Sequence, residues 1–152
     1  MAYHETKSRR LAPYEDAIEV LRLLSTNTDL LLGVISEGLE VKQAEKLVRM
    51  RVTQFLSPSA IFISTQIGIS MPNPKLYQRA CSDLNLKPAE TMYVGDNPLH
   101  DIDPPNSIGM IAVRMRRAGK YYNSDSKSKP ARVVQNFWDF LDYLKQDFEL
   151  KV

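Results

Sequence analysis

Two aspartates lie five positions apart just after a short apolar run. Asp96 and Asp101 follow residues 92–94, with Gly95 between the run and the first carboxylate. Mg²⁺ prefers oxygen ligands and is usually held by one or two carboxylates while water and substrate phosphate complete its shell. Because Gly95 has no Cβ, a ligand can approach the backbone closely there. Asp, Asn and Pro are also ordinary turn formers, so the stretch fits either a metal site or a strand followed by a polar turn.

The elements that must position these carboxylates alternate between helix and strand. Apolar spacing predicts helices over residues 14–24, 41–50, 76–84 and 133–148, and Pro72 and Pro74 precede the third of them. Short apolar runs predict strands over residues 30–35, 61–63, 92–94 and 110–113. Pro104 and Pro105 limit the segment after Asp101 to a short helix, and Trp138 is expected to pack beside the last helix's apolar face. This alternation predicts an open, mostly parallel α/β sheet.

In such sheets, ligands bind outside the carboxyl ends of the strands. Ser36, Ser64 or Thr65, and Asp96 all fall at predicted strand ends. Their convergence favours a site over a plain turn.

Length and composition exclude several classes of protein. The 152 residues, 43% of them hydrophobic, fit one domain with a core, and a net charge of +2 gives no reason to expect nucleic acid as a partner. The basic residues Arg114, Arg116, Arg117 and Lys120 are interpreted as a solvated strand end. Cys81 is the single cysteine, so no internal disulfide can form. No apolar run is long enough to span a membrane, and we expect a cytoplasmic protein.

Four segments occur in a recognisable order: LAPYEDA (11–17), LGVISEG (32–38), MPNPKLY (71–77) and VGDN with the following Asp101 (94–101). In this order they resemble the haloacid dehalogenase-like (HAD) hydrolase superfamily, in its phosphatase and 2-haloacid dehalogenase branch. The resemblance covers residues 3–121 and implies a three-layer, Rossmann-like core. It also implies a single HAD-like domain over residues 1–152, with residues 1–12 as a remnant of the cap domain or linker.

The same resemblance implies roles for individual residues. Phosphate would be bound by Ser36, Glu37, Gly38 and Lys75. Asp96 and Asp101 would bind or orient Mg²⁺, and the substrate would be a small phosphorylated compound or a haloacid. Ser36 could instead be a simple strand-end cap, and Lys75 a solvated residue in the first turn of its helix.

Two departures from the family pattern affect catalysis. The nucleophile motif Asp-x-Asp-x-Thr on an N-terminal strand is absent, and Asp16 lies on a predicted helix, so no catalytic nucleophile is assigned. Met71 stands where the family has a lysine, and methionine cannot balance the charge of a phosphate. We expect the chain to begin inside the last helix of the cap and to be inactive alone.

The family's nucleophile strand lies between the strand ending at Ser36 and the strand ending at Gly95. Without it, the two strands could pair directly, accept the N-terminal segment, or pair with another chain. Residues 1–10 are too charged for a central strand, so the sequence predicts a homo-oligomer or a complementing N-terminal fragment. Two functions remain open: a Mg²⁺-dependent phosphatase-type hydrolase, or a non-catalytic HAD-fold protein used for binding or oligomerisation.

Overall fold

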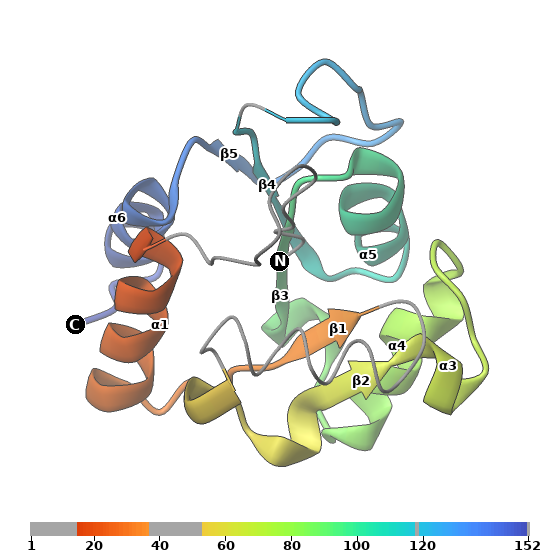
Figure 1. Ribbon diagram of the computed structural model, residues 1–152, viewed down its shortest axis with the longest axis horizontal. Coiled ribbons are helices and arrows are strands. Elements are labelled where there is room, and N and C mark those ends of the chain that lie inside the picture. The colour runs from red at the N-terminus through yellow and green to blue at the C-terminus, as the bar shows by residue number, and fades with distance from the viewer. Residues whose placement is uncertain (1–14, 37–52, 118, 152) are drawn as a thin grey trace, which may run out of the picture.

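Two parallel sheets form the centre of the fold (Figure 1). The computed structural model describes residues 15–36, 53–117 and 119–151. One sheet pairs β1 (Val34–Ser36) with β2 (Ile61–Ile63). The other places β4 (Ile111–Met115) between β3 (Met92–Gly95) and β5 (Arg132–Val134). Within the described ranges no pairing joins β1 to β3.

Helices cover both faces of these sheets. Helices α1 (Glu15–Asn27) and α6 (Phe137–Asp147) lie side by side in Figure 1, and α4 (Pro74–Asp83) lies apart from them. Alternate side chains of β3 divide between them: Met92 and Val94 pack into the core of α1 and α6, and Tyr93 packs into the core of α4. Because successive strand residues point to opposite faces, the arrangement is three-layered.

The predicted α/β fold with a mostly parallel sheet is confirmed, as are the helices at the positions of α1 and α4. The predicted helix over residues 41–50 lies outside the described residues. The segment predicted as a strand over residues 30–35 is regular only as β1, because Ser57 already donates to the carbonyl of Leu32 from outside the sheet. Direct pairing of the two strands, one of the three expected solutions, is not found in the described residues.

The start of the predicted last helix is wrong. Val133 and Val134 belong to β5, which pairs with β4 in the register Arg114↔Val133, and the helix begins at Phe137. β-branched residues favour strands, and the side chain of Asn136 caps α6 by accepting from Asp139. Trp138, expected to pack, is 45% exposed because it lies on the outer face of α6.

Of the basic residues interpreted as a solvated strand end, Arg114 does not fit that interpretation, whereas Lys120 is exposed. Arg114 is buried, and its guanidinium donates to three carbonyl oxygens of the following loop, those of Tyr121, Tyr122 and Ser124. All three contacts are made by Nη2, so one arginine nitrogen contacts the backbone of this loop at three positions. The sequence shows a basic cluster, whereas in the fold the buried Arg114 side chain binds the backbone of the loop that follows β4.

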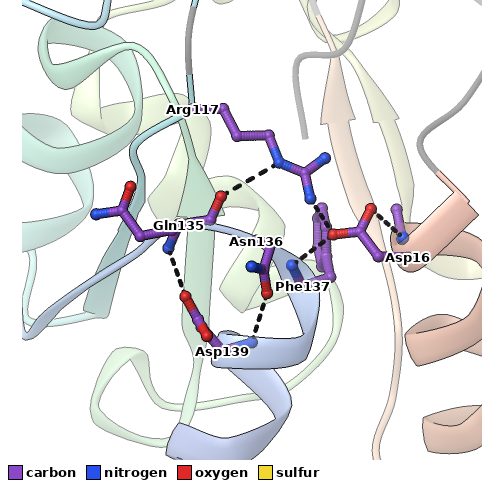
Figure 2. Close-up of polar contacts among 7 residues, drawn as sticks. Asp16, Arg117, Gln135, Asn136, Phe137 and Asp139 are labelled. Atoms are coloured by element: carbon purple, nitrogen blue, oxygen red, sulfur yellow. Dashed lines mark hydrogen bonds and ion pairs between the residues drawn. The ribbon is translucent and has the colours of Figure 1, made fainter.

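Asp16 joins three elements (Figure 2). Its carboxylate pairs with the Arg117 guanidinium and accepts the backbone N–H of Phe137 at 2.8 Å, at the start of α6. Arg117 also donates to the carbonyl of Gln135 at 3.3 Å. α1, α6 and the segment after β4 are therefore tied by one carboxylate, and the expectation that Asp16 lies on a helix is confirmed.

The helix that follows Asp101 is short, as Pro104 and Pro105 predict. α5 (Asp103–Ser107) is a five-residue helix, and it follows directly on a π-helical turn over Pro98–Ile102. Within the described residues, no helix is long and apolar enough to cross a bilayer.

Candidate active site

Asp96 and Asp101 are brought together by a chain reversal after β3. Asp101 folds back over Gly95 so closely that a Cβ on Gly95 would lie 2.3 Å from Cγ of Asp101. The backbone N–H of Asn97 donates to Oδ2 of Asp101 at 2.9 Å. Glycine is therefore required at position 95, because any side chain would displace the carboxylate.

The reversal is built by local capping. The Asn97 side chain accepts from the N–H of Leu99 at 3.2 Å, and Pro98 occupies the first turn, where its missing N–H costs nothing. The carbonyl of Asn97 accepts from the N–H of Asp101 at 2.7 Å. Local hydrogen bonds within the sequence Asn-Pro-Leu-His-Asp thus direct Asp101 back toward the end of β3.

The carboxylate of Asp101 lies in a dry environment. The residue is 5% exposed, and burial raises the pKa of Asp101 to about 6, with the nearby charge of Asp96 raising it further and the Asn97 N–H opposing the shift. The described residues provide no Lys or Arg ion pair for it. Burial outweighs the groups that lower this pKa, the charge of His100 among them, so an ionised Asp101 would gain from a further positive charge.

Two tyrosines support the site and were not assigned a role from the sequence. The hydroxyl of Tyr77 in α4 donates to the carbonyl of His100 at 2.5 Å, and its ring meets that of Tyr93 edge to face at 5.2 Å. Burial, followed by the charge of Asp101, raises the pKa of Tyr93 well above its usual value. A tyrosine at a buried helix position needs a hydroxyl partner, and that requirement was the available sequence signal for Tyr77.

The other predicted site residues are less closely gathered. Ser36 is half-buried at the end of β1, beside β2, and lines a cavity between the sheets. Lys75 is exposed in the first turn of α4, where its N–H is capped by Asn73, and it forms no ion pair with a described acidic side chain. Glu37 and Gly38 lie outside the described residues.

Met71, at the position of the family's lysine, packs against the buried cluster of Leu76, Tyr77, Cys81 and Met110. A thioether suits such an apolar contact. The side chain that would have carried positive charge at this point therefore contributes packing.

The donor set at Asp96 and Asp101 fits a hard cation. Mg²⁺ needs only one or two protein carboxylates, and both residues supply oxygen ligands next to a glycine whose lack of a side chain lets the Asp101 carboxylate approach the end of β3. Across the described part of the chain, no group of three or more His, Cys, Asp or Glu side chains is arranged around one point. The pair would thus be completed by water and by oxygen atoms from outside these residues.

A cavity of about 620 Å³ separates the two sheets. Its walls include Val34, Ile35 and Ser36 from β1, and Met92 and Val94 from β3.

Comparisons with known proteins agree with the motif order. Residues 1–115 match the family described as Haloacid dehalogenase-like hydrolase. The chain is 41% identical over 128 residues to the glyceraldehyde 3-phosphate phosphatase of Methanopyrus kandleri, a match covering 84% of this chain and 53% of the relative. It is 30% identical over 111 residues to the phosphoserine phosphatase of Thermus thermophilus, covering 73% of this chain and 44% of that protein.

The fold is also found among solved structures. The crystal structure of a HAD family hydrolase from Deinococcus radiodurans with bound phosphate and sodium superposes with a TM-score of 0.79 at 20% identity, covering 91% of this chain and 61% of that one. At this identity the similarity concerns the fold alone. The chain spans about half the length of the curated relatives it matches.

Proposed function

Because the chain belongs to the haloacid dehalogenase-like hydrolase family, we propose that it forms the metal- and phosphate-binding part of a Mg²⁺-dependent phosphomonoester hydrolase. The observation that carries the proposal is the buried carboxylate of Asp101, folded over Gly95 beside Asp96, with a pKa raised to about 6. A buried carboxylate whose pKa stays raised gains free energy when a cation binds beside it, which supports a role for Asp101 as a metal ligand.

Asp96 and Asp101 would hold the Mg²⁺. When bound, the cation would neutralise charge on the phosphoryl group. Asn97 fixes the orientation of Asp101 through its N–H, and Tyr77 fixes the turn through the carbonyl of His100. The hydroxyl of Ser36, at the end of β1, would donate to a phosphate oxygen.

The nucleophile would come from outside the described residues. Asp16 is committed to Arg117 and to the N–H of Phe137, and Asp103 accepts from the backbone and side chain of Ser128. Neither carboxylate is available to attack a substrate. We therefore propose that the 152 residues have no turnover alone and act with a partner that supplies an acidic nucleophile.

The substrate class would be a small phosphate monoester. The names of the relatives from Methanopyrus kandleri and Thermus thermophilus, both phosphatases of small metabolites, support this class. Oxygen ligands for Mg²⁺ suit phosphate better than a carbon–halogen bond, which has no anionic oxygen for the cation to bind.

A second candidate is a non-catalytic HAD-fold protein that binds a cation or phosphate. One observation favours it: Met71 packs in an apolar cluster where the family has a lysine, so the charge that would balance the nucleophile is lacking.

The test is hydrolysis of p-nitrophenyl phosphate with and without MgCl₂. The chain would be assayed alone and together with a polypeptide containing the part of the Methanopyrus kandleri relative that lies outside the matched residues. We expect no activity from the chain alone and Mg²⁺-dependent activity from the mixture, falling at least about 100-fold in Asp96→Asn.

Asp103→Asn is the matched control, since it removes one carboxylate outside the pair and should retain activity. Activity of the chain alone would place the nucleophile within it. No activity in the mixture, with Mg²⁺ binding intact, would favour the second candidate.

A further inference from the structure

We infer that Tyr77 is a positioning residue of the cation site: its hydroxyl holds the peptide unit that precedes Asp101 and thereby sets how tightly Asp96 and Asp101 bind a divalent cation. The hydroxyl donates to the carbonyl of His100 at 2.5 Å, across 23 positions of the chain. The inference rests on the proposed function, because it concerns the same cation site. It assigns no contact between Tyr77 and the cation, so the effect passes through Asp101.

The carbonyl of His100 takes its donor from another element because the helical positions after it supply none. A helical hydrogen bond to this carbonyl would come from the fourth or fifth residue along the chain, and these are Pro104 and Pro105, which have no N–H. The N–H of Asp103, three positions on, donates to the carbonyl of Pro98 instead. The hydroxyl from α4 therefore supplies the donor that the prolines cannot.

The peptide unit between His100 and Asp101 is held at both of its polar groups. Its C=O accepts from Tyr77, and its N–H donates to the carbonyl of Asn97 at 2.7 Å. Because a peptide unit is planar, these two hydrogen bonds together fix its orientation, and with it the Cα from which the Asp101 side chain extends. The carboxylate is then placed by its own bond from the Asn97 N–H, at 2.9 Å. Loss of the Tyr77 hydroxyl would leave this peptide unit held at its N–H only.

Tyr77 is itself firmly placed. Its side chain is fully buried in the apolar cluster of α4. Its ring meets the ring of Tyr93 edge to face, with the centroids 5.2 Å apart. Tyr93 belongs to β3 and precedes Gly95, over which Asp101 folds, by two positions. The hydroxyl that orients the turn is thus held by α4 and by the strand that carries the site.

The geometry that Mg²⁺ demands makes the position of this carboxylate important. Mg²⁺ requires near-ideal octahedral coordination, so displacement of one oxygen ligand weakens its binding. Groups that orient the ligands of a metal change its affinity by roughly 10- to 100-fold when they are removed. Tyr77 holds the residue before the ligand and not the ligand itself, so we expect a smaller effect on cation affinity, of about fivefold.

The experiment is a Mn²⁺ titration of the full chain at pH 7.5, followed by water-proton relaxation. Tyr77→Phe removes only the hydroxyl, and we expect it to bind Mn²⁺ at least about fivefold more weakly than the wild type. Tyr143→Phe is the matched control, because Tyr143 is also buried and meets the ring of Phe148 edge to face at 5.5 Å, but belongs to α6. This control should bind Mn²⁺ as the wild type does. Equal affinity in the wild type and Tyr77→Phe would overturn the inference.

A double variant separates positioning from a general loss of stability. In an Asp101→Asn background, which lacks the ionised ligand, Tyr77→Phe should change the affinity for Mn²⁺ by less than about twofold. A fivefold loss that persists in this background would overturn the inference, because Tyr77 would then act by a route other than Asp101. Urea denaturation of the same variants measures stability separately. A loss of stability with unchanged Mn²⁺ affinity would show a purely structural role and also overturn the inference.

The same link is measured in the wild type if Tyr77→Phe loses its circular dichroism spectrum. Coupling between two parts of a protein is reciprocal, so a cation bound at Asp101 should stabilise the contact with α4. We expect MgCl₂ to slow amide hydrogen exchange, followed by mass spectrometry, in Pro98–Ile102 and in Pro74–Asp83, and to leave Phe137–Asp147 unchanged. Unchanged exchange in α4 of a chain that binds the cation would overturn the inference.

The wild type and Asp101→Asn distinguish a failure of this inference from a failure of the proposed function. If Mn²⁺ binds to the wild type and more weakly to Asp101→Asn, the cation site stands, and the result for Tyr77→Phe bears on the inference alone. If the two bind Mn²⁺ equally, or neither binds it, the cation site of the proposed function is refuted and the inference falls with it.

Discussion

Asp16 and Asp101 are both largely removed from water, yet the protein treats them in opposite ways. The Asp16 carboxylate is neutralised by Arg117 and receives the N–H of Phe137. Asp101 receives one N–H, from Asn97, lies beside another carboxylate, and has its pKa raised to about 6 by burial. A carboxylate paired with a guanidinium holds elements together, whereas a buried carboxylate whose pKa stays raised gains free energy from a ligand that supplies further positive charge.

The largest effect is expected at the satisfied carboxylate. Asp16→Ala should lower the free energy of unfolding by about 3 to 5 kcal/mol, because Arg117 would keep a buried charge without its partner. Urea denaturation measures this, with Glu19→Ala, which breaks an exposed ion pair to Arg22, as the control that changes little. Asp16→Ala combined with Arg117→Met should recover part of the loss. A double variant as unstable as the sum of both single variants would argue against the pairing.

Substitution of Asp101 is expected to raise the free energy of unfolding at neutral pH, the opposite of the effect at Asp16. Its pKa is about 6 in the folded protein against an ordinary value of 3.8, so ionising it costs up to about 3 kcal/mol of folding free energy. The folded state holds this proton more tightly, so stability falls as the pH rises from 4 to 6 and stays low above that. Asp101→Asn should therefore be more stable than the wild type at pH 7.5 and equal to it at pH 3.5. Thermal unfolding of both proteins at the two pH values measures this difference. An Asp101→Asn variant less stable than the wild type at pH 7.5 would contradict the contrast drawn between Asp101 and Asp16.

Binding of Mg²⁺ should offset the free energy that is lost when Asp101 ionises in the folded protein. We expect 10 mM MgCl₂ to stabilise the wild type by about 1 kcal/mol at pH 7.5, with a smaller effect at pH 5, where Asp101 is largely protonated. Differential scanning fluorimetry against NaCl of equal ionic strength measures the shift. It should vanish in Asp96→Asn and persist in Asp16→Asn, compared with each variant's own metal-free sample. An equal shift at both pH values would point to nonspecific binding.

The smallest change in stability is expected on substitution of Asp103. Like Asp16, this aspartate has hydrogen-bond partners, in its case Lys127 and Ser128. Burial acts to raise the pKa of Asp103, but hydrogen bonds from Lys127 and Ser128 prevail and lower it. Asp103→Asn should lose about 1 kcal/mol or less above pH 4, and the loss should disappear as the pH falls below 4. The two variants, Asp103→Asn and Asp101→Asn, should thus differ from the wild type with opposite signs at pH 7.5.

The sequence predicted what depends on local pattern. Apolar runs located β2 and β3, the prolines before α4 marked its start, and the order Gly95, Asp96, Asn97, Pro98 indicated a reversal that carries carboxylates. Each of these features is decided by residues close to one another in the chain. That is why the carboxylate pair, though not its electrostatics, could be found before the structure.

What the sequence could not predict depends on distant contacts. Asp16 and Arg117 are 101 positions apart, and nothing in either segment indicates the other. β5 is a strand because β4 offers it an edge, and Arg114 is buried because β4 becomes the central strand of its sheet. Propensity is a weak guide wherever pairing order decides the environment.

The most direct test of the difference between Asp16 and Asp101 is a Mn²⁺ titration followed by water-proton relaxation, since Mn²⁺ accepts the same oxygen ligands as Mg²⁺. At pH 7.5 we expect one Mn²⁺ per wild-type chain, binding at least about tenfold weaker in Asp101→Asn, and unchanged binding in Asp103→Asn. Equal affinity in the wild type and Asp101→Asn would contradict the assignment of Asp96 and Asp101 as a cation site.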